Sequence, residues 1–150
     1  MRVLRIYVDA SVIGGCFDPE FASESQALIK MAEEGRVRLI ISDLLVRELQ
    51  DAPEAVRELF TSLPAHVLDA FTLNEEAYFL SRAYLEAGVV GPVSEDDAQH
   101  VANATVAHAD MLVSWNLRHI VHFDKIRGYN AVNLREGYAL LSIHTPKEVV

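Results

Sequence analysis

The sequence contains three carboxylates whose positions suit the binding of a metal ion. Asp9 directly follows the apolar run VLRIYV, Glu48 lies in the stretch SDLLVRELQ, and Asp97 belongs to SEDDAQHVANA. Carboxylate oxygens are ligands that hard cations such as Mg²⁺ and Mn²⁺ prefer in proteins. Each residue also has an ordinary structural use, because acidic side chains are common at the first turns of helices. Local sequence leaves both interpretations open.

Asp97 presents the two alternatives most clearly. Ser94 is a suitable N-cap and Ser94-x-x-Asp97 matches a capping box, so we expect a helix over residues 95–109 that begins after Ser94. On that helix Asp97 shares a face with Val101 and Ala104. The same carboxylate is therefore expected both to serve the helix end and to point inward, toward the end of a strand.

The histidines offer a second kind of metal site. His119-x-x-His122 is a spacing that some zinc sites use, and His100 follows Asp97 by three residues. Cys16 is the only cysteine, so a zinc site with two thiolates from one chain is not available. The oxygen ligands favour Mg²⁺ or Mn²⁺ over zinc, and we expect His100 at most to orient a carboxylate.

Apolar runs that alternate with helical patterns predict how the carboxylates are positioned. Strands are predicted at four places and, more weakly, at a fifth: residues 3–8, 37–41, 111–114, 131–134 and 140–144. Helices are predicted over residues 22–34, 43–60 (one or two, around Pro53), 74–87 and 95–109. This alternation predicts a parallel sheet with helices on both faces. Ligands of such sheets bind beyond the carboxyl ends of the strands, where polar groups gather in this sequence.

Composition and charge narrow the class of protein. The chain has the length of one domain, and we treat residues 1–150 as a single domain. Its formal net charge of −9 disfavours non-specific binding to nucleic acid, which depends on Lys and Arg. Residues 117–135 are locally basic, and their cations are Arg118, Lys125, Arg127 and Arg135. No apolar run suits a membrane span, and a single cysteine is typical of a reducing, cytoplasmic location.

Asp9 after the first strand, Glu48 on the helix after the second, Asp97 opening DAQHVANA, and the stretch DMLVSWNLRHI together resemble the PIN-domain family. Within it the sequence looks most like the VapC-like toxins of type II toxin–antitoxin pairs and their solitary relatives. The resemblance covers essentially the whole chain. It implies a three-layer α/β/α sandwich around a mostly parallel sheet, and divalent-metal-dependent hydrolysis of RNA phosphodiester bonds. It also implies a homodimer and an antitoxin partner.

The family's acidic cluster falls on Asp9, Glu48 and Asp97, so the resemblance implies that these residues hold Mg²⁺ or Mn²⁺. A fourth polar position, often Asp in relatives, falls on Asn116, which we expect to be a weak or indirect ligand. Ser11 matches a hydroxyl position that often lies near the metal. Contacts to the RNA would come from the basic segment, through Arg118, Lys125 and Arg127.

Two departures from the family pattern keep other functions open. Asn116 replaces the usual acid, and His119 stands where many relatives have aspartate. One alternative is a PIN-like protein that acts only as a binding partner. The other is a receiver-type signalling domain that binds Mg²⁺. That domain needs paired acids after the first strand, whereas Ala10 and Ser11 follow Asp9 here.

Overall fold

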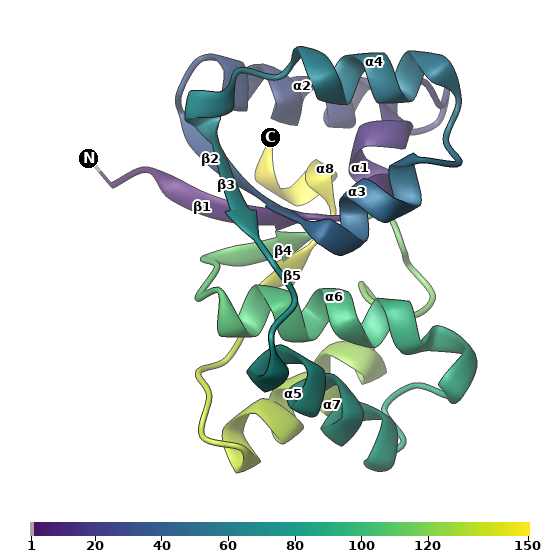
Figure 1. Ribbon diagram of the computed structural model, residues 1–150, viewed down its shortest axis with the longest axis vertical. Coiled ribbons are helices and arrows are strands. Elements are labelled where there is room, and N and C mark those ends of the chain that lie inside the picture. Colours follow the sequence, from purple (N-terminus) through teal and green to yellow (C-terminus); the bar gives the residue numbers. More distant parts are fainter. Residues whose placement is uncertain (1) are drawn as a thin grey trace.

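The computed structural model describes residues 2–150, which form a five-stranded sheet with helices on both faces (Figure 1). The strands are β1 (Leu4–Val8), β2 (Val37–Ser42), β3 (Leu68–Phe71), β4 (Met111–Val113) and β5 (Ile143–His144). Every neighbouring pair is parallel, and the strand order is β3-β2-β1-β4-β5. The predicted α/β/α architecture is confirmed.

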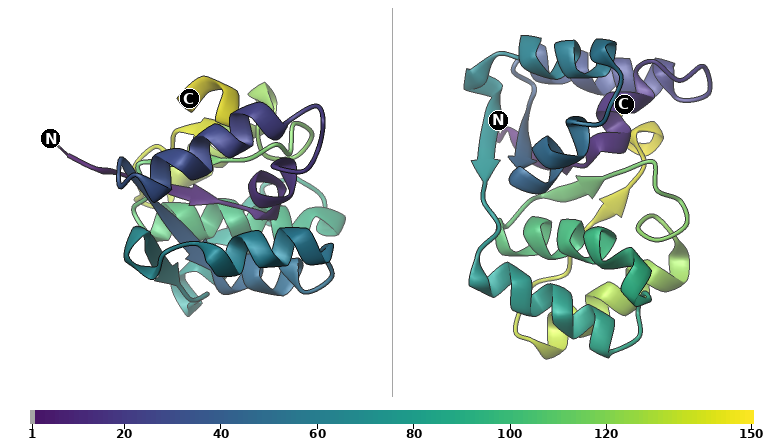
Figure 2. Two further views of the ribbon diagram at one scale, coloured as in Figure 1. Left: turned by 90° about the horizontal axis from the view of Figure 1, so that it is seen from above. Right: turned by 45° about the vertical axis from the view of Figure 1, so that its right-hand side comes forward.

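Two layers of helices cover the sheet. They are α1 (Ala10–Gly15), α2 (Ala22–Glu33), α3 (Asp43–Leu49), α4 (Glu54–Ser62), α5 (Glu75–Glu86), α6 (Glu95–Val106), α7 (Phe123–Arg135) and α8 (Pro146–Val149), with 3₁₀ turns η1 (Ala65–Val67) and η2 (Pro92–Ser94). Helices α1 to α4 and α8 lie on one face, and α5, α6 and α7 lie on the other (Figures 1 and 2). None of the helices in residues 2–150 is long and apolar enough to cross a membrane.

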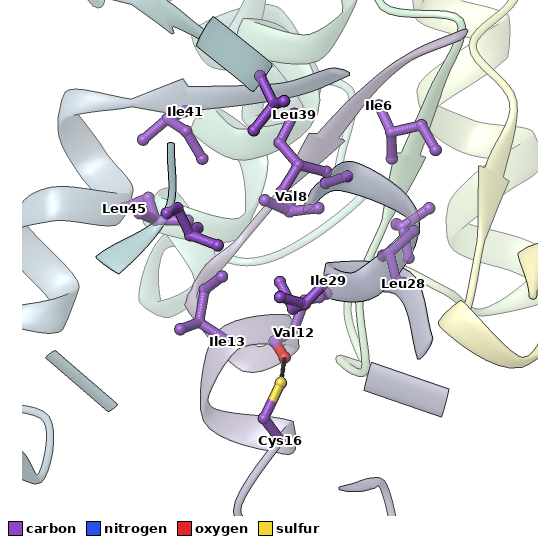
Figure 3. Close-up of a cluster of buried hydrophobic side chains, with 14 of the residues drawn as sticks. Ile6, Val8, Val12, Ile13, Cys16, Leu28, Ile29, Leu39, Ile41 and Leu45 are labelled. Carbon is purple, nitrogen blue, oxygen red and sulfur yellow. Dashed lines mark hydrogen bonds between the residues drawn. The ribbon is translucent and has the colours of Figure 1, made fainter. Parts of the chain in front are cut away.

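The sheet separates two apolar cores, because successive side chains of a strand point to opposite faces. Ile6 and Val8 of β1 belong to the core beneath α1 and α2, whereas Tyr7 belongs to the core beneath α5 and α6. Figure 3 shows the first of these cores, which also contains Cys16. Burial raises the pKa of the Cys16 thiol to about 11, as expected for a packed side chain without chemistry of its own.

Two predicted elements differ from the structure. The strand predicted at residues 131–134 is wrong, because these residues form the last part of α7 and bury Val132 and Asn133. Conversely, β3 was not predicted, since its LDAF sequence is short and places Asp69 among apolar residues. Asp69 is accommodated by Arg38 of the neighbouring strand β2 and by Arg5 of β1, whose guanidinium groups donate to it. The weak fifth strand is confirmed as β5.

The strand order creates the crevice in which ligands of open α/β sheets bind. The chain moves outward from β1 to β2 and β3, and then returns to add β4 on the other side of β1. Ligand sites lie beyond the carboxyl ends of the strands at such a reversal. Asp9 follows β1 there and Ser114 follows β4. The order also differs from 2-1-3-4-5, the order of receiver-type sheets, which argues against that alternative.

Gly15 of α1 leaves no room for a side chain. A Cβ added there would lie 2.6 Å from Ser25 Oγ and 2.9 Å from Trp115 Nε1, two atoms that are hydrogen-bonded to each other. We predict that Gly15→Ala lowers the free energy of unfolding by about 1–3 kcal/mol, because this pair must shift. Urea denaturation of the purified variant measures the change.

Gly14 provides the matched control from the same helix. A Cβ added at Gly14 meets nothing within 4 Å. Gly14→Ala is therefore expected to be neutral or slightly stabilising, because alanine has the higher helix propensity. Equal urea midpoints for Gly14→Ala and Gly15→Ala would contradict the close packing of α1.

Candidate functional site

Asp9 stands at the end of β1, where it is almost completely buried and caps α1. Its Oδ1 accepts hydrogen bonds from the backbone N–H of Ser11 at 3.1 Å and from the Ser11 hydroxyl at 2.5 Å. Its Oδ2 accepts from the hydroxyl of Ser114 at 2.6 Å. The carboxylate is thus held by donors from two elements, α1 and the end of β4.

The same two hydroxyls fix the loop that follows β4. Ser11 Oγ accepts from the backbone N–H of Trp115 at 2.9 Å, and Ser114 Oγ accepts from that of Asn116 at 2.9 Å. Ser11, which the resemblance placed near a metal, is therefore a direct hydrogen-bond partner of Asp9. Sequence analysis placed Ser114 at a strand end but gave it no role, although only its contact with Asp9 completes this arrangement.

Asn116 reaches the third carboxylate. Its Nδ2 donates to Asp97 Oδ1 at 3.0 Å, which joins the β4 loop to α6. Its Oδ1 accepts from the backbone N–H groups of Arg118 at 3.3 Å and His119 at 2.9 Å. Both ends of the amide are thus used within the protein. The geometry suits an indirect role for Asn116, as a residue that orients Asp97, better than a role as a ligand.

The start of α6 differs from the predicted capping box. Ser94 ends the 3₁₀ turn η2 and its side chain makes no capping hydrogen bond. Pro92 opens that turn, so the chain enters the helix from a 3₁₀ conformation in place of the extended one that an N-cap usually adopts. Asp97 therefore takes no part in a capping box, and its carboxylate accepts a hydrogen bond from Asn116. The inward direction predicted for its helix face is confirmed by the burial of Val101.

Glu48 is the second acid predicted for the site, and its partner comes from the opposite face of the sheet. Glu48 Oε1 on α3 lies 2.8 Å from Nε2 of His100 on α6. The Glu48 side chain is 31% exposed and the His100 side chain only 2%, so the carboxylate is the solvent-accessible member of the pair. His100 does orient a carboxylate, but this carboxylate is Glu48, not the Asp97 that precedes it on the same helix.

The charges of these residues act on one another. Burial raises the pKa of Asp97, and the negative charges of Asp9 and Glu48 raise it further, while His119 and His100 lower it. Burial by itself lowers the pKa of His100, but its hydrogen bond to Glu48 and the surrounding acids outweigh burial and raise it. A cation near Asp97 would favour its ionised form, since an opposite charge lowers the pKa of a carboxyl group.

The chemistry of the donors fits a hard cation. Among residues 2–150, no three histidine, cysteine, aspartate or glutamate side chains lie close enough together to form a complete ion site. Asp97 Oδ2 and Glu48 Oε2 nevertheless accept no hydrogen bond from the described residues, so Asp97 and Glu48 each keep one carboxylate oxygen free. Carboxylate oxygens are suitable ligands for Mg²⁺ or Mn²⁺.

The basic residues do not form one continuous stripe. Arg118 is exposed in the loop after β4, and its backbone N–H donates to the same Asn116 side chain that bonds to Asp97. Lys125 and Arg127 are two positions apart on α7, which places them about 200° apart around the helix. Lys125 Nζ donates to the backbone carbonyl of Val89 at 2.9 Å, and the Arg127 guanidinium lies 5.4 Å from the ring centroid of Phe123. Arg118 is thus the expected RNA contact that shares a hydrogen-bond partner, Asn116, with Asp97.

An aromatic pair that sequence analysis did not single out borders the site. Trp115 stacks on Phe21 with ring centroids 4.3 Å apart, and its Nε1 donates to Ser25 Oγ at 2.7 Å. A shallow pocket beside Asp9 is lined by Ser11, Gly14, Gly15, Asp18, Phe21, Trp115 and Asn116. The only sequence signal for it was the position of Trp115 directly after β4.

Solved structures share this fold at low sequence identity. The crystal structure of VapBC2 from Rickettsia felis bound to a DNA fragment from their promoter matches with a TM-score of 0.58, at 14% identity over 95% of this chain and 98% of that one. The structure of FitAcB from Neisseria gonorrhoeae matches with a TM-score of 0.56, at 15% identity over the same shares. No protein-family model matches the sequence, and no curated protein is similar to it. The matches confirm the PIN-like fold.

Replacing Asp97 by asparagine removes a charge that the fold disfavours. Because the pKa of Asp97 is raised in the folded protein, its ionised form costs stability at pH values above that raised pKa. The cost disappears as the pH falls below the ordinary aspartate pKa of about 3.9. We predict that metal-free Asp97→Asn melts at a higher temperature than the parent protein at neutral pH, and that the difference shrinks on acidification.

Asp96 supplies the control for this measurement. It is an exposed neighbour on the same helix, and it forms an ion pair with Arg47 at 3.0 Å. Asp96→Asn should therefore give no gain in melting temperature at neutral pH. An Asp97→Asn variant that melts below the parent protein at neutral pH would show that the hydrogen bond to Asn116, not charge repulsion, governs this position.

Proposed function

We propose that the protein is a divalent-metal-dependent endoribonuclease, the toxin component of a type II toxin–antitoxin pair. The observation that carries the proposal is the placement of three acids on a PIN-like sheet, with Asp9 at the end of β1, Asp97 bonded to the loop after β4, and Glu48 bonded to His100 on the helix of Asp97. The carboxyl edge is where α/β sheets bind their ligands, and carboxylate oxygens there suit a divalent cation.

Asp9, Asp97 and Glu48 are the residues that would hold Mg²⁺ or Mn²⁺. When bound, such an ion polarises a phosphoryl oxygen and makes a water more acidic. The protein's own part is to orient the ligands. Ser11 and Ser114 hold Asp9 through both of its oxygens, and Asn116 holds Asp97 through one.

Metal binding should be visible without any substrate. A divalent ion that binds only the folded protein stabilises it by about 1.4 kcal/mol at ten times its dissociation constant. For a domain of this size that is a rise in melting temperature of about 3–6 °C. We predict this rise with Mn²⁺ for the parent protein, together with Mn²⁺-dependent cleavage of a mixed RNA, and we predict the loss of both in Asp9→Asn.

Asp51 is a suitable control, because it is an exposed acid in the turn between α3 and α4. Asp51→Asn should keep the thermal shift and the cleavage. Cleavage that continues at full rate in chelator, or in Asp9→Asn, would refute the metal-dependent mechanism.

Arg118 is the proposed contact to the RNA backbone. Because the chain carries a net charge of −9, loss of a cation beside the acids should matter more than its loss elsewhere. We predict that Arg118→Glu weakens RNA binding several-fold at low salt, as measured in an Asp9→Asn background so that the RNA stays intact. The matched control is Arg36→Glu, which makes the same charge change before β2, at the opposite edge of the sheet. Equal losses in both variants would indicate a general charge effect and remove Arg118 from the binding surface.

An antitoxin protein and a second copy of the chain are the proposed partners, and the cytoplasm is the proposed location. An apolar hollow between α2 and α4 supports a protein partner, because Ile29 and Leu59 line it beside Phe17, whose side chain is 52% exposed. Tyr78 and Phe79 are exposed on α5 in the other helical layer, where they offer apolar area for a homodimer.

A PIN-like protein that only binds a partner is the second candidate. It is favoured by Asn116, whose amide oxygen is occupied by backbone N–H groups and brings no charge to the site. The cleavage assay with Mn²⁺ separates the two candidates, since only the nuclease loses an activity when Asp9 is changed.

A further inference from the structure

Glu48 differs from the other two acids because its hydrogen-bond partner is a buried imidazole. His100 Nε2 lies 2.8 Å from Glu48 Oε1, and the imidazole is nearly inaccessible to solvent. His100 also lies one turn after Asp97 on α6. The imidazole therefore links the helix that carries one acid to the side chain of another.

The hydrogen-bonded chain continues into the core beneath α6. His100 Nδ1 lies 2.7 Å from the hydroxyl of Tyr7, which sits on β1 two residues before Asp9. The Tyr7 hydroxyl also accepts from Nδ2 of Asn103 at 3.2 Å. Tyr7 and Asn103 are completely buried, so neither group can exchange these partners for solvent.

The chain ends on the helix that carries Glu48. The Tyr7 hydroxyl is 2.9 Å from Ser42 Oγ, and Ser42 caps α3 by accepting from the backbone N–H of Leu45 at 3.1 Å. Both ends of the network thus lie on α3, one at its N-cap and one at Glu48. A closed arrangement of this kind restrains the carboxylate relative to the helix, to β1 and to α6 together.

A second buried tyrosine shows what a network without this role looks like. Tyr84 is as buried as Tyr7, and its hydroxyl donates to Asn133 and lies 3.4 Å from Thr105 Oγ1. This network joins α5, α6 and α7 and touches no acid of the site. A buried tyrosine hydroxyl in this protein can therefore form its hydrogen bonds in a network that contains no carboxylate.

We propose that His100 and Tyr7 are positioning residues, which hold Glu48 by Oε1 and leave Oε2 free for the ion. The consequence for metal binding rests on the proposed function, whereas the ordering of Glu48 does not. Loss of a partner that orients a metal ligand typically weakens metal binding 10–100-fold. We therefore expect Tyr7→Phe, which removes only the hydroxyl, to weaken Mn²⁺ binding at least about 10-fold.

The experiment compares Tyr7→Phe with Tyr84→Phe, which also loses one buried hydroxyl. Both variants should lower the urea midpoint by similar amounts, because each leaves buried polar groups without a partner. Only Tyr7→Phe should weaken Mn²⁺ binding, measured from the electron paramagnetic resonance signal of free Mn²⁺. In a Glu48→Gln background the same substitution should have little further effect on Mn²⁺ binding, as expected when two residues act through one contact.

A measurement on the metal-free protein separates the positioning role from the proposed function. With ¹³C-labelled glutamate, NMR relaxation should show an ordered Glu48 side chain in the parent protein and in Tyr84→Phe, and a mobile one in Tyr7→Phe and His100→Phe. An equally ordered Glu48 in all four proteins would overturn the positioning role. So would an unchanged Mn²⁺ affinity in Tyr7→Phe when the parent protein binds the ion. A parent protein with an ordered Glu48 but neither Mn²⁺ binding nor RNA cleavage would refute the proposed function and leave the positioning role standing.

Discussion

Burial of acidic side chains near the carboxyl ends of the strands is the constraint to which the rest of the site responds. Parallel strands deliver their carboxyl ends to one edge of the sheet, and an acid buried there needs hydrogen-bond donors whether or not a counter-ion is present. The fold supplies each acid with a donor from a segment distant in sequence, and the pairs are Asp9 with Ser114, Asp97 with Asn116, and Glu48 with His100. These donors hold the acids in place through hydrogen bonds.

The pleat of β1 connects the site to both cores. Val8 points into the core beneath α1 and α2, Tyr7 points into the core beneath α6, and Asp9 emerges at the rim. A shift of β1 by one residue would turn each of these three side chains to the opposite face of the sheet, since side chains alternate with a period of two. The packing of the sheet and the geometry of the acids therefore depend on a single register, in which Ile6 pairs with Leu39 and Met111.

Elements that local sequence patterns encode were predicted correctly. Features that depend on contacts between residues distant in sequence were missed. The strands β1, β2 and β4 follow from apolar runs, and the structure confirms them. The AVNL run of residues 131–134 has strand-forming residues, yet Asn133 bonds to Tyr84 across the second core, and this packing keeps the run helical. The partner of His100 is likewise 52 residues away in sequence, so no spacing rule along one helix identifies it.

The reactivity of Cys16 reports local opening of the core in which it is packed. The thiol is 4% exposed, packs in the core between α1 and α2, and has a pKa of about 11, so it reacts with alkylating reagents only when that core opens. No second cysteine competes for the reagent. The labelling rate of the unmodified chain thus follows local opening of the layer that carries Ser11, one of the two hydroxyl supports of Asp9. A ligand that makes the carboxyl edge of the sheet more rigid would therefore slow the alkylation of the Cys16 thiol.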